Sequence, residues 1–151
     1  MNKIVYGLIT ISLLTTTFSM INIHPYQGLY FNEIIDMKWA KQNFPIDYWG
    51  LTIREGLEWL VEHDDRENIK VYTYGMDSIY ILNKDDMERV TFSLFNINGD
   101  VWTLDADYII NNYDHVQVDY DYGVEAYTKK INGASIMQVR RLDGSTLYWT
   151  E

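Results

Sequence analysis

The sequence predicts a protein of the α/β class, with an N-terminal transmembrane helix followed by a small mixed α/β domain that ends in an antiparallel β-hairpin. Three observations lead to this prediction. Residues 4–23 form a run of 20 residues without a charge. Apolar residues recur at helical spacing over residues 53–61. An Asn-Gly pair at residues 132–133 separates two segments that are rich in strand-forming residues.

The overall composition limits the kinds of partner. The chain of 151 residues has the size of one ordinary domain, and its net charge is −10. We expect no nucleic-acid partner, because this charge repels a polyanion and no run of Lys or Arg exceeds two residues. The absence of cysteine excludes disulfides, thiolate metal sites and cysteine nucleophiles. Aromatic residues make up 15% of the chain, which favours a folded domain over an acidic disordered segment.

Residues 1–23 are predicted to form a transmembrane anchor or an uncleaved signal. As a helix, the uncharged run would extend about 30 Å, the thickness of the hydrocarbon core of a bilayer. The alternatives are a signal peptide cleaved near residues 17–19 and a buried helix of a soluble protein, although signal cores usually have about 7–15 residues. Lys3 favours a cytoplasmic start. We therefore expect a single-pass membrane protein with membrane lipid as a partner and residues 24–151 extracytoplasmic.

Residues 24–50 are predicted to form a membrane-proximal collar and a turn. Aromatic side chains with a polar tip favour the headgroup layer, and this segment is rich in interfacial residues. They are His24, Tyr26, Tyr30, Phe31 and Trp39. Residues 29–42 could form a short helix or irregular collar near the membrane, or the first core element of the soluble domain. Pro45 disfavours helix in the residue before it, and residues 47–50 read as a turn.

The α/β domain is predicted to span residues 51–151 and to begin with a helix. Thr52 and Glu55 have the spacing of a capping box, in which each side chain satisfies a free backbone N–H group. The apolar stripe that follows places one face of the helix in the core and predicts that the helix runs to about His63. It consists of Ile53, Leu57, Leu60 and Val61.

The remaining segments are predicted to be mostly strands. Residues 69–74 are β-branched and aromatic and precede Gly75, whereas residues 77–82 fit a helix or a strand. Further strands are expected at residues 90–95, followed by turn residues 96–100, and at residues 106–110, whose consecutive apolar residues suit burial on both faces. A last short strand is expected at residues 146–150.

The most specific local signal predicts a hairpin. Asn132 and Gly133 suit the positive φ angles of a type I′ turn between strands at residues 125–131 and 134–142.

Several short motifs occur together in a characteristic order. HPYQ at residues 24–27 and YFN at residues 30–32 follow the apolar run, and DYWG at residues 47–50 leads into a helix with REGLEWL at residues 54–60. ADYII at residues 106–110 and the INGASI hairpin continue the pattern. This arrangement resembles the last membrane helix and C-terminal extracytoplasmic domain of bacterial glycosyltransferase family 39 enzymes, which are relatives of the protein mannosyltransferases of the GT-C class. Departures lie at residues 35–37, where the family usually has glycines, and at Arg140, where it usually has Tyr.

The resemblance implies a role in the transfer of a sugar from a lipid-phosphate donor to an acceptor outside the cytoplasm. In that family the catalytic acidic residue lies in the first extracytoplasmic loop of a bundle of many membrane helices, and this chain has no corresponding region. We therefore expect an acceptor-positioning or assembly module with no catalytic residue and no cofactor of its own. The expected partners are a multi-span glycosyltransferase or a missing N-terminal region, and a saccharide or polyprenyl-phosphate sugar.

Five residues are candidate contacts for the acceptor or the membrane interface: His24, Tyr26, Tyr30, Tyr48 and Trp49. His24 could contact a lipid phosphate or could simply be an interfacial histidine. Tyr48 and Trp49 could form a sugar-stacking platform, but we favour the alternative that Trp49 packs under the start of the helix.

No metal site is expected. Asp105 and Asp107 match the bare Asp-x-Asp pattern of metal-dependent glycosyltransferases, but so short a pattern arises often in an acidic chain. Residues 119–125 place carboxylates at alternate positions and depart from the calcium-loop pattern, so we interpret them as a solvated acidic loop. The alternatives to the transferase module are a membrane-anchored, non-enzymatic binding domain and a truncated relic without function.

Overall fold

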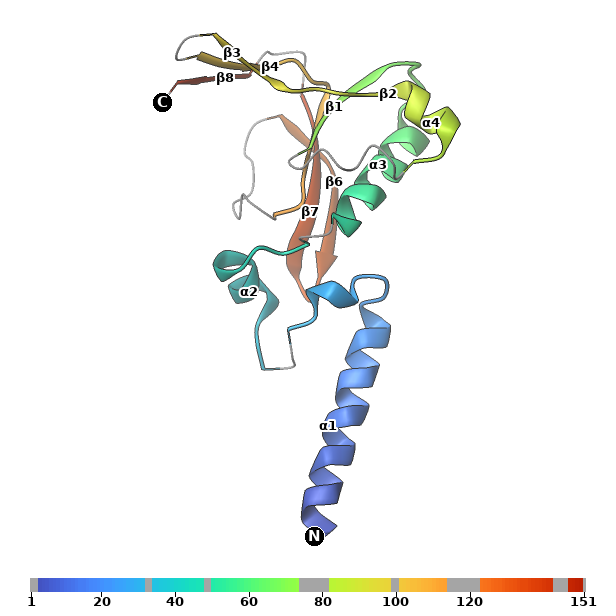
Figure 1. Ribbon diagram of the computed structural model, residues 1–151, viewed down its shortest axis with the longest axis vertical. Helices are drawn as coiled ribbons and strands as arrows, with labels where there is room; N and C mark the ends of the chain where they lie inside the picture. The colour runs from blue at the N-terminus through green and yellow to red at the C-terminus, as the bar shows by residue number, and fades with distance from the viewer. Residues whose placement is uncertain are drawn as a thin grey trace.

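The N-terminal helix extends away from the rest of the molecule, and a small second sheet lies at the opposite end (Figure 1). Between them lies a five-stranded mixed sheet, covered on one face by a helix. This computed structural model describes residues 3–31, 34–47, 50–73, 82–98, 101–113, 123–142 and 147–150.

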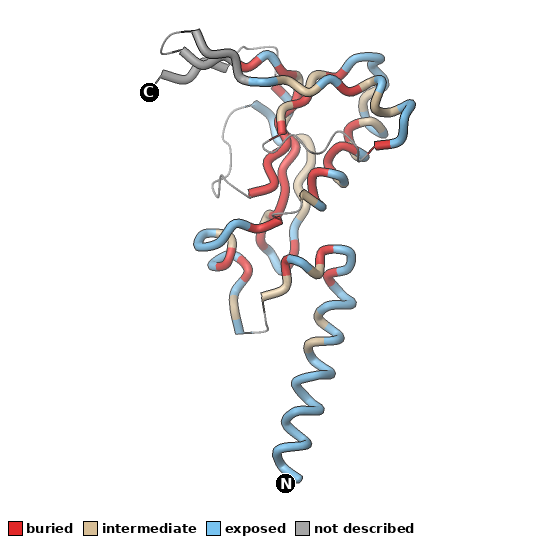
Figure 2. The backbone as a smooth tube through the Cα atoms, viewed as in Figure 1, coloured by how far each residue is buried: buried red, intermediate tan, exposed pale blue. Residues whose placement is uncertain are grey.

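Helix α1 (Lys3–Asn22) corresponds within one residue to the predicted uncharged run. None of its 20 residues is buried, and it is exposed along nearly its whole length (Figure 2). Among the described residues, α1 is the one helix that is both long enough and apolar enough to cross a membrane. It lies near the N-terminus, where a signal sequence would also lie. The predicted N-terminal apolar helix is therefore confirmed.

The collar contains the 3₁₀ helix η1 (Gln27–Leu29) and the short helix α2 (Met37–Asn43). The Asp36 carboxylate caps α2 by accepting two backbone N–H groups, and α2 ends where Phe44 becomes extended before Pro45. Collar residues share one buried cluster with Ile23, Tyr113 and the tip of the hairpin formed by β6 (Val124–Ile131) and β7 (Ala134–Arg141). Its members are Ile23, Tyr26, Leu29, Met37, Ala40, Ile46, Tyr113, Ile131, Ala134 and Ile136. Part of residues 29–42 is therefore packed into the core of the domain, through Leu29, Met37 and Ala40.

Helix α3 (Leu51–His63) confirms the predicted apolar stripe and ends at the predicted residue. Its start differs from the prediction. The helix begins after Gly50, which has a φ of 66°, so Thr52 lies inside the first turn. The predicted capping box is wrong, because the Asp47 carboxylate accepts the N–H groups of Leu51 and Thr52 instead. The Glu55 carboxylate is directed to the sheet rather than back to the helix terminus.

The main sheet has the order β2-β1-β5-β7-β6. Its strands are β1 (Ile69–Thr73), β2 (Val90–Phe92), β5 (Tyr108–Asn111), β6 (Val124–Ile131) and β7 (Ala134–Arg141). Strand β1 pairs in parallel with both β2 and β5, whereas β7 runs antiparallel to β5 and β6. The short helix α4 (Lys84–Arg89) leads directly into β2.

The core lies on both faces of this sheet. Every residue of β5 is buried, as its apolar run predicted. Tyr108 and Ile110 belong to the cluster that packs against α3, and Ile109 belongs to the cluster that contains Leu104 and Leu142. Because neighbouring strand residues point to opposite faces, β5 joins the two clusters through the middle of the sheet.

The prediction of a single strand at residues 90–95 is wrong. Strand β2 ends at Phe92, and the Ser93 hydroxyl then donates to the Asp105 carbonyl at 2.5 Å. The next strand, β3 (Phe95–Asn98), belongs to a second, antiparallel sheet with β4 (Val101–Leu104) and β8 (Leu147–Thr150). The predicted turn is therefore wrong for residues 96–98, which belong to β3, and residues 99–100 lie outside the described part of the chain.

The predicted Asn-Gly hairpin is present. Asn132 and Gly133 have φ angles of 48° and 78° and connect β6 to β7. The hairpin does not end the domain, because β8 follows it and pairs with β4. The predictions for Gly75, and for residues 77–82 apart from Leu82, lie outside the described residues.

Candidate functional site

The first candidate site is the junction between α1 and the domain. The chain passes from α1 into the buried cluster without an intervening linker, because Ile23 and Tyr26 are already buried. The Tyr30 hydroxyl lies 3.5 Å from the hydroxyl of Thr16 on α1. The collar is thus in contact with the C-terminal part of the helix.

A small cavity of about 140 Å³ lies at this junction. Ser19 and Asn22 of α1, Phe31 and Ile35 of the collar, and Asn132 of the hairpin tip are among the residues that line it. These segments therefore lie beside one another at the end of the domain from which α1 leaves.

Three of the predicted contact residues, His24, Tyr30 and Tyr26, differ in how far they are buried. His24 is exposed, and its Nδ1 lies 2.6 Å from the Nε2 of Gln27. Tyr30 is partly buried between the collar and α1. Tyr26 is only 4% exposed, and its ring lies 5.2 Å from the Lys129 ammonium, so Tyr26 serves the core.

Tyr48 and Trp49 lie outside the described residues. Their neighbour Asp47 is buried and holds the start of α3. Burial raises the pKa of the Asp47 carboxyl, and hydrogen bonds from Thr52 and Leu51 partly oppose that effect. Asp47, the first residue of the turn, is therefore hydrogen-bonded to the start of α3.

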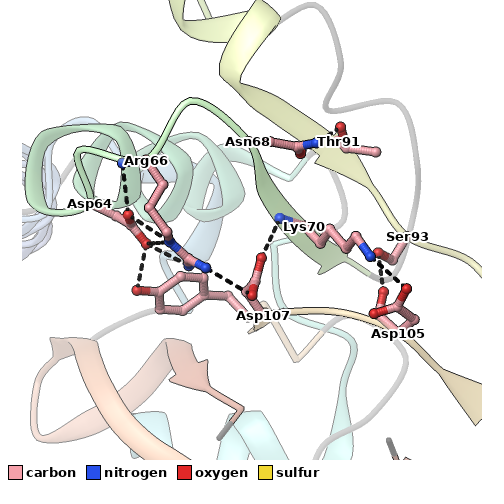
Figure 3. A network of polar contacts seen from close by, with 9 residues as sticks. Asp64, Arg66, Asn68, Lys70, Thr91, Ser93, Asp105 and Asp107 are labelled. Carbon is pink, nitrogen blue, oxygen red and sulfur yellow. Dashed lines mark hydrogen bonds and ion pairs between the residues drawn. The ribbon is translucent and has the colours of Figure 1, made fainter. Parts of the chain in front are cut away.

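The second candidate site is a polar network at the start of β1 and β5 (Figure 3). The Arg66 guanidinium joins two carboxylates, with 2.7 Å from Nη2 to Asp64 Oδ2 and 3.0 Å from Nη1 to Asp107 Oδ1. Asp107 also accepts the backbone N–H of Lys70 at 2.8 Å. The Tyr108 hydroxyl donates to Asp64 at 3.0 Å.

A second arginine, Arg89 of α4, forms hydrogen bonds with the loop that carries this network. The Arg89 side chain donates to the carbonyl oxygens of Val61, Asp64 and Arg66. These bonds link the connection between α3 and β1 to α4, and the one to Val61 satisfies a carbonyl that the end of α3 leaves free. The network is thus built on a loop that is hydrogen-bonded to the Arg89 side chain.

The electrostatics of the network do not favour proton transfer by Asp64, Arg66 or Tyr108 near neutral pH. Hydrogen bonds from Arg66 lower the pKa of the Asp64 carboxyl to about 2, and the hydrogen bond to Asp64 raises the pKa of the Arg66 guanidinium. Burial and the bond to Asp64 raise the pKa of the Tyr108 hydroxyl. At neutral pH these three groups keep one protonation state, whereas a general acid or base needs a pKa near the working pH.

A polar hollow of about 510 Å³ lies beside the network. Its lining includes the ionised Asp64 and Arg66 and the exposed Asp65 and Arg141. The lining thus offers both hydrogen-bond donors, on the arginines, and acceptors, on the carboxylates. Such a lining suits a neutral polar ligand with several hydroxyl or amide groups.

Asp105 and Asp107, which match the Asp-x-Asp pattern, point to different cations of the chain (Figure 3). Asp105 pairs with the Lys70 ammonium at 2.6 Å, and Asp107 pairs with Arg66. Among the residues that the structure describes, no group of three His, Asp or Glu side chains is placed to hold a metal ion. Most of the acidic loop at residues 119–125 lies outside the described part of the chain.

Sequence reasoning missed a third polar group, between α3 and β6. The Glu55 carboxylate accepts the Tyr127 hydroxyl and lies 3.0 Å from the Lys129 ammonium. Burial and the contact with Glu55 raise the pKa of Tyr127 to about 12. The Tyr127 ring stacks on Trp59 at 5.4 Å between centroids. Only the alternation of residues 127 and 129 on one strand face could have indicated this group from the sequence.

No protein-family model matches the chain, and neither a curated protein nor a solved structure matches it.

Proposed function

We propose that the chain is a membrane-anchored, extracytoplasmic module of a machinery that transfers sugar from a lipid-phosphate donor. In this proposal, α1 spans the membrane with Lys3 on the cytoplasmic side, and residues 24–151 form a cap on the outer face. The module positions the acceptor or assembles with a multi-span transferase that supplies the catalytic carboxylate. The resemblance of the short motifs to family 39 glycosyltransferases supports the choice of chemistry.

The observation that carries the proposal is the junction between α1 and the domain. An exposed apolar helix enters a buried cluster with no flexible linker between them. A domain that only needed to be tethered would tolerate a linker, whereas a domain that must stand at a defined height above a membrane-embedded site requires a rigid junction. A cap of this kind can hold an acceptor in place and exclude water from the reaction.

Isolation of the tagged full chain from membranes in mild detergent tests the proposal. We expect a multi-span membrane protein to co-purify, and we expect deletion of the gene to reduce glycosylation of the cell envelope. A matched control carries an unrelated single-span helix in place of residues 3–22. If the control restores glycosylation as well as the native chain, α1 acts only as an anchor. The proposal fails if no multi-span partner co-purifies and the glycans are unchanged on deletion.

A second candidate function is a non-enzymatic binding domain, which the polar hollow beside Arg66 and Arg141 favours. It predicts that the full chain in detergent binds a neutral oligosaccharide without any transferase present. Arg141→Ala removes an exposed lining group and should weaken that binding, whereas Arg54→Ala on the outer face of α3 should not. A transferase module with no affinity of its own would show no binding in either variant.

A further inference from the structure

A group of large apolar side chains is exposed on the collar. Ile34 is 92% exposed, Trp39 is 49% exposed and Phe44 is 42% exposed. The Phe44 ring lies 5.7 Å from that of Trp39 and 5.8 Å from that of Phe31, so three rings form one continuous surface. We call Phe31, Ile34, Trp39 and Phe44 the aromatic collar face. Single exposed apolar residues are common in soluble proteins, but a continuous patch usually marks an interaction surface.

The aromatic collar face lies beside the last turns of α1. Phe31 and Ile35 line the same small cavity as Ser19 and Asn22 of α1. Ile34 lies between Phe31 and Ile35 in the sequence, and both of these residues lie beside the last turn of α1. Figure 1 shows this segment descending from the domain on the side from which α1 leaves. If α1 crosses a bilayer, its last turn stands at the boundary of the hydrocarbon core, and the aromatic collar face stands at that boundary too.

The charges around this surface suit lipid phosphates. Lys38, next to Trp39, is exposed, and its Cε atom lies near Gly133 at the hairpin tip. Lys130, on the last part of β6, is exposed as well. Residues 129–134 contain no acidic residue, although the whole chain carries a net charge of −10. The exposed Asp36 carboxylate of the collar accepts the backbone N–H groups of Lys38 and Trp39. Exposed lysines and half-exposed aromatic rings are both side chains that settle at a membrane–water interface.

We propose that the aromatic collar face inserts into the headgroup layer of the membrane that α1 crosses, with Lys38 and Lys130 pairing with lipid phosphates. This inference rests on the proposed anchoring of α1 and adds a second contact, which fixes the tilt of the domain. Continuity with α1 and the local lysines favour a lipid surface over a second copy of the acidic chain. The tryptophan is the residue type best suited to the position, because its ring is apolar and its N–H stays near water.

The absence of cysteine from the chain allows a direct test with single cysteines carrying a nitroxide label. The full chain is reconstituted into phospholipid nanodiscs, and the accessibility of the label to oxygen and to a water-soluble nickel chelate gives its depth. Three positions are compared: Ile34→Cys on the aromatic collar face, Leu13→Cys in the middle of α1, and Leu94→Cys, an exposed apolar residue remote from the collar. We expect Leu13→Cys in the hydrocarbon, Ile34→Cys at headgroup depth and Leu94→Cys in water.

The outcomes separate this inference from the proposed anchoring. A label at Ile34→Cys that is as accessible to the chelate as that at Leu94→Cys, with Leu13→Cys in the hydrocarbon, overturns the inference and leaves the anchor intact. A water-accessible label at Leu13→Cys overturns the anchor itself. If dipolar broadening at Ile34→Cys grows with protein concentration in detergent, a second copy covers the surface and the inference is wrong.

Substitutions on the surface give a second readout. Trp39→Ser with Phe44→Ser should return the label at Ile34→Cys to water, whereas Leu94→Ser should leave its depth unchanged. Lys38→Glu with Lys130→Glu should reduce the depth, and Lys84→Glu on α4 serves as the control because that residue is exposed and far along the chain from the collar. Equal depth in the two charge-reversed proteins would contradict the role of the lysines.

Discussion

The Asp47 carboxylate accepts the backbone N–H of Thr52 at 2.7 Å and the hydroxyl of the same residue at 2.5 Å. Its other oxygen accepts the N–H of Leu51 at 2.8 Å. Asp47 lies four residues before Leu51, the first residue of α3, so this one buried side chain connects the collar to that helix.

Asp47→Ala should lower the free energy of unfolding by about 2 kcal/mol, the upper end for loss of a helix cap, because three donors lose their acceptor. The measurement is urea unfolding of the full chain in mild detergent, followed by near-ultraviolet circular dichroism. Asp36→Ala is the matched control, since Asp36 caps α2 from an exposed position. A loss at Asp47 no larger than that at Asp36 would contradict the role of Asp47 in joining the two segments.

Stability in acid should depend on Asp64. Its folded-state pKa of about 2 lies below the ordinary value of 3.8, so the native state favours the ionised carboxylate. The resulting stabilisation is complete above the ordinary pKa and is lost as the pH falls towards about 2. Asp64→Asn should flatten the fall in the free energy of unfolding over this range. An unchanged pH dependence in the variant would show that Arg66 does not hold Asp64 in its ionised form.

Stability in alkali should depend on Tyr127. Its folded-state pKa of about 12 lies above the ordinary value of 10.0, because burial and Glu55 disfavour the phenolate. The stabilisation is therefore complete below the ordinary pKa and is lost as the pH rises from there towards about 12. Tyr127→Phe should remove this part of the alkaline loss. Identical alkaline profiles for the two proteins would rule out the contact between Tyr127 and Glu55.

Gly56 allows α3 to approach the sheet closely. A Cβ atom at this position would lie 3.1 Å from Ile110 Cγ2 and 3.3 Å from Met137 Sδ. Gly56→Val should therefore lower the free energy of unfolding by about 1–3 kcal/mol, as overpacked cores do. Gly28→Val is a control, because a Cβ there meets nothing within 4 Å. Comparable thermal unfolding of the two variants would place α3 farther from β5 and β7 than the structure has it.

The elements that the sequence predicts well are those with local causes. The spacing of Ile53, Leu57 and Leu60 determines which face of α3 is buried, and Asn132-Gly133 supplies the φ angles of the hairpin turn without help from other segments. The elements that it misses depend on distant contacts. The separation of β2 from β3 depends on Ser93, which bonds the carbonyl of Asp105, and neither residue signals that pairing alone.

The candidate sites show the same division. The apolar run predicts α1, but aromatic composition alone could not separate the buried Tyr26 from the exposed Trp39. The polar network needed the parallel pairing of β1 with β5, which brings Arg66 to Asp107 across 41 positions of sequence. The Asp-x-Asp pattern alone could not show that the side chains of Asp105 and Asp107 face different cations.

Labelling of single cysteines in intact cells tests the central claim, that α1 holds the domain on the outer side of a membrane. Val124→Cys is exposed on the domain, and Asn2→Cys lies before α1. A maleimide that cannot cross membranes should label Val124→Cys and not Asn2→Cys, in a membrane-bound protein whose mass includes residues 1–23. Labelling of neither position until the cells are lysed, or recovery of a shorter soluble protein without those residues, would contradict the account.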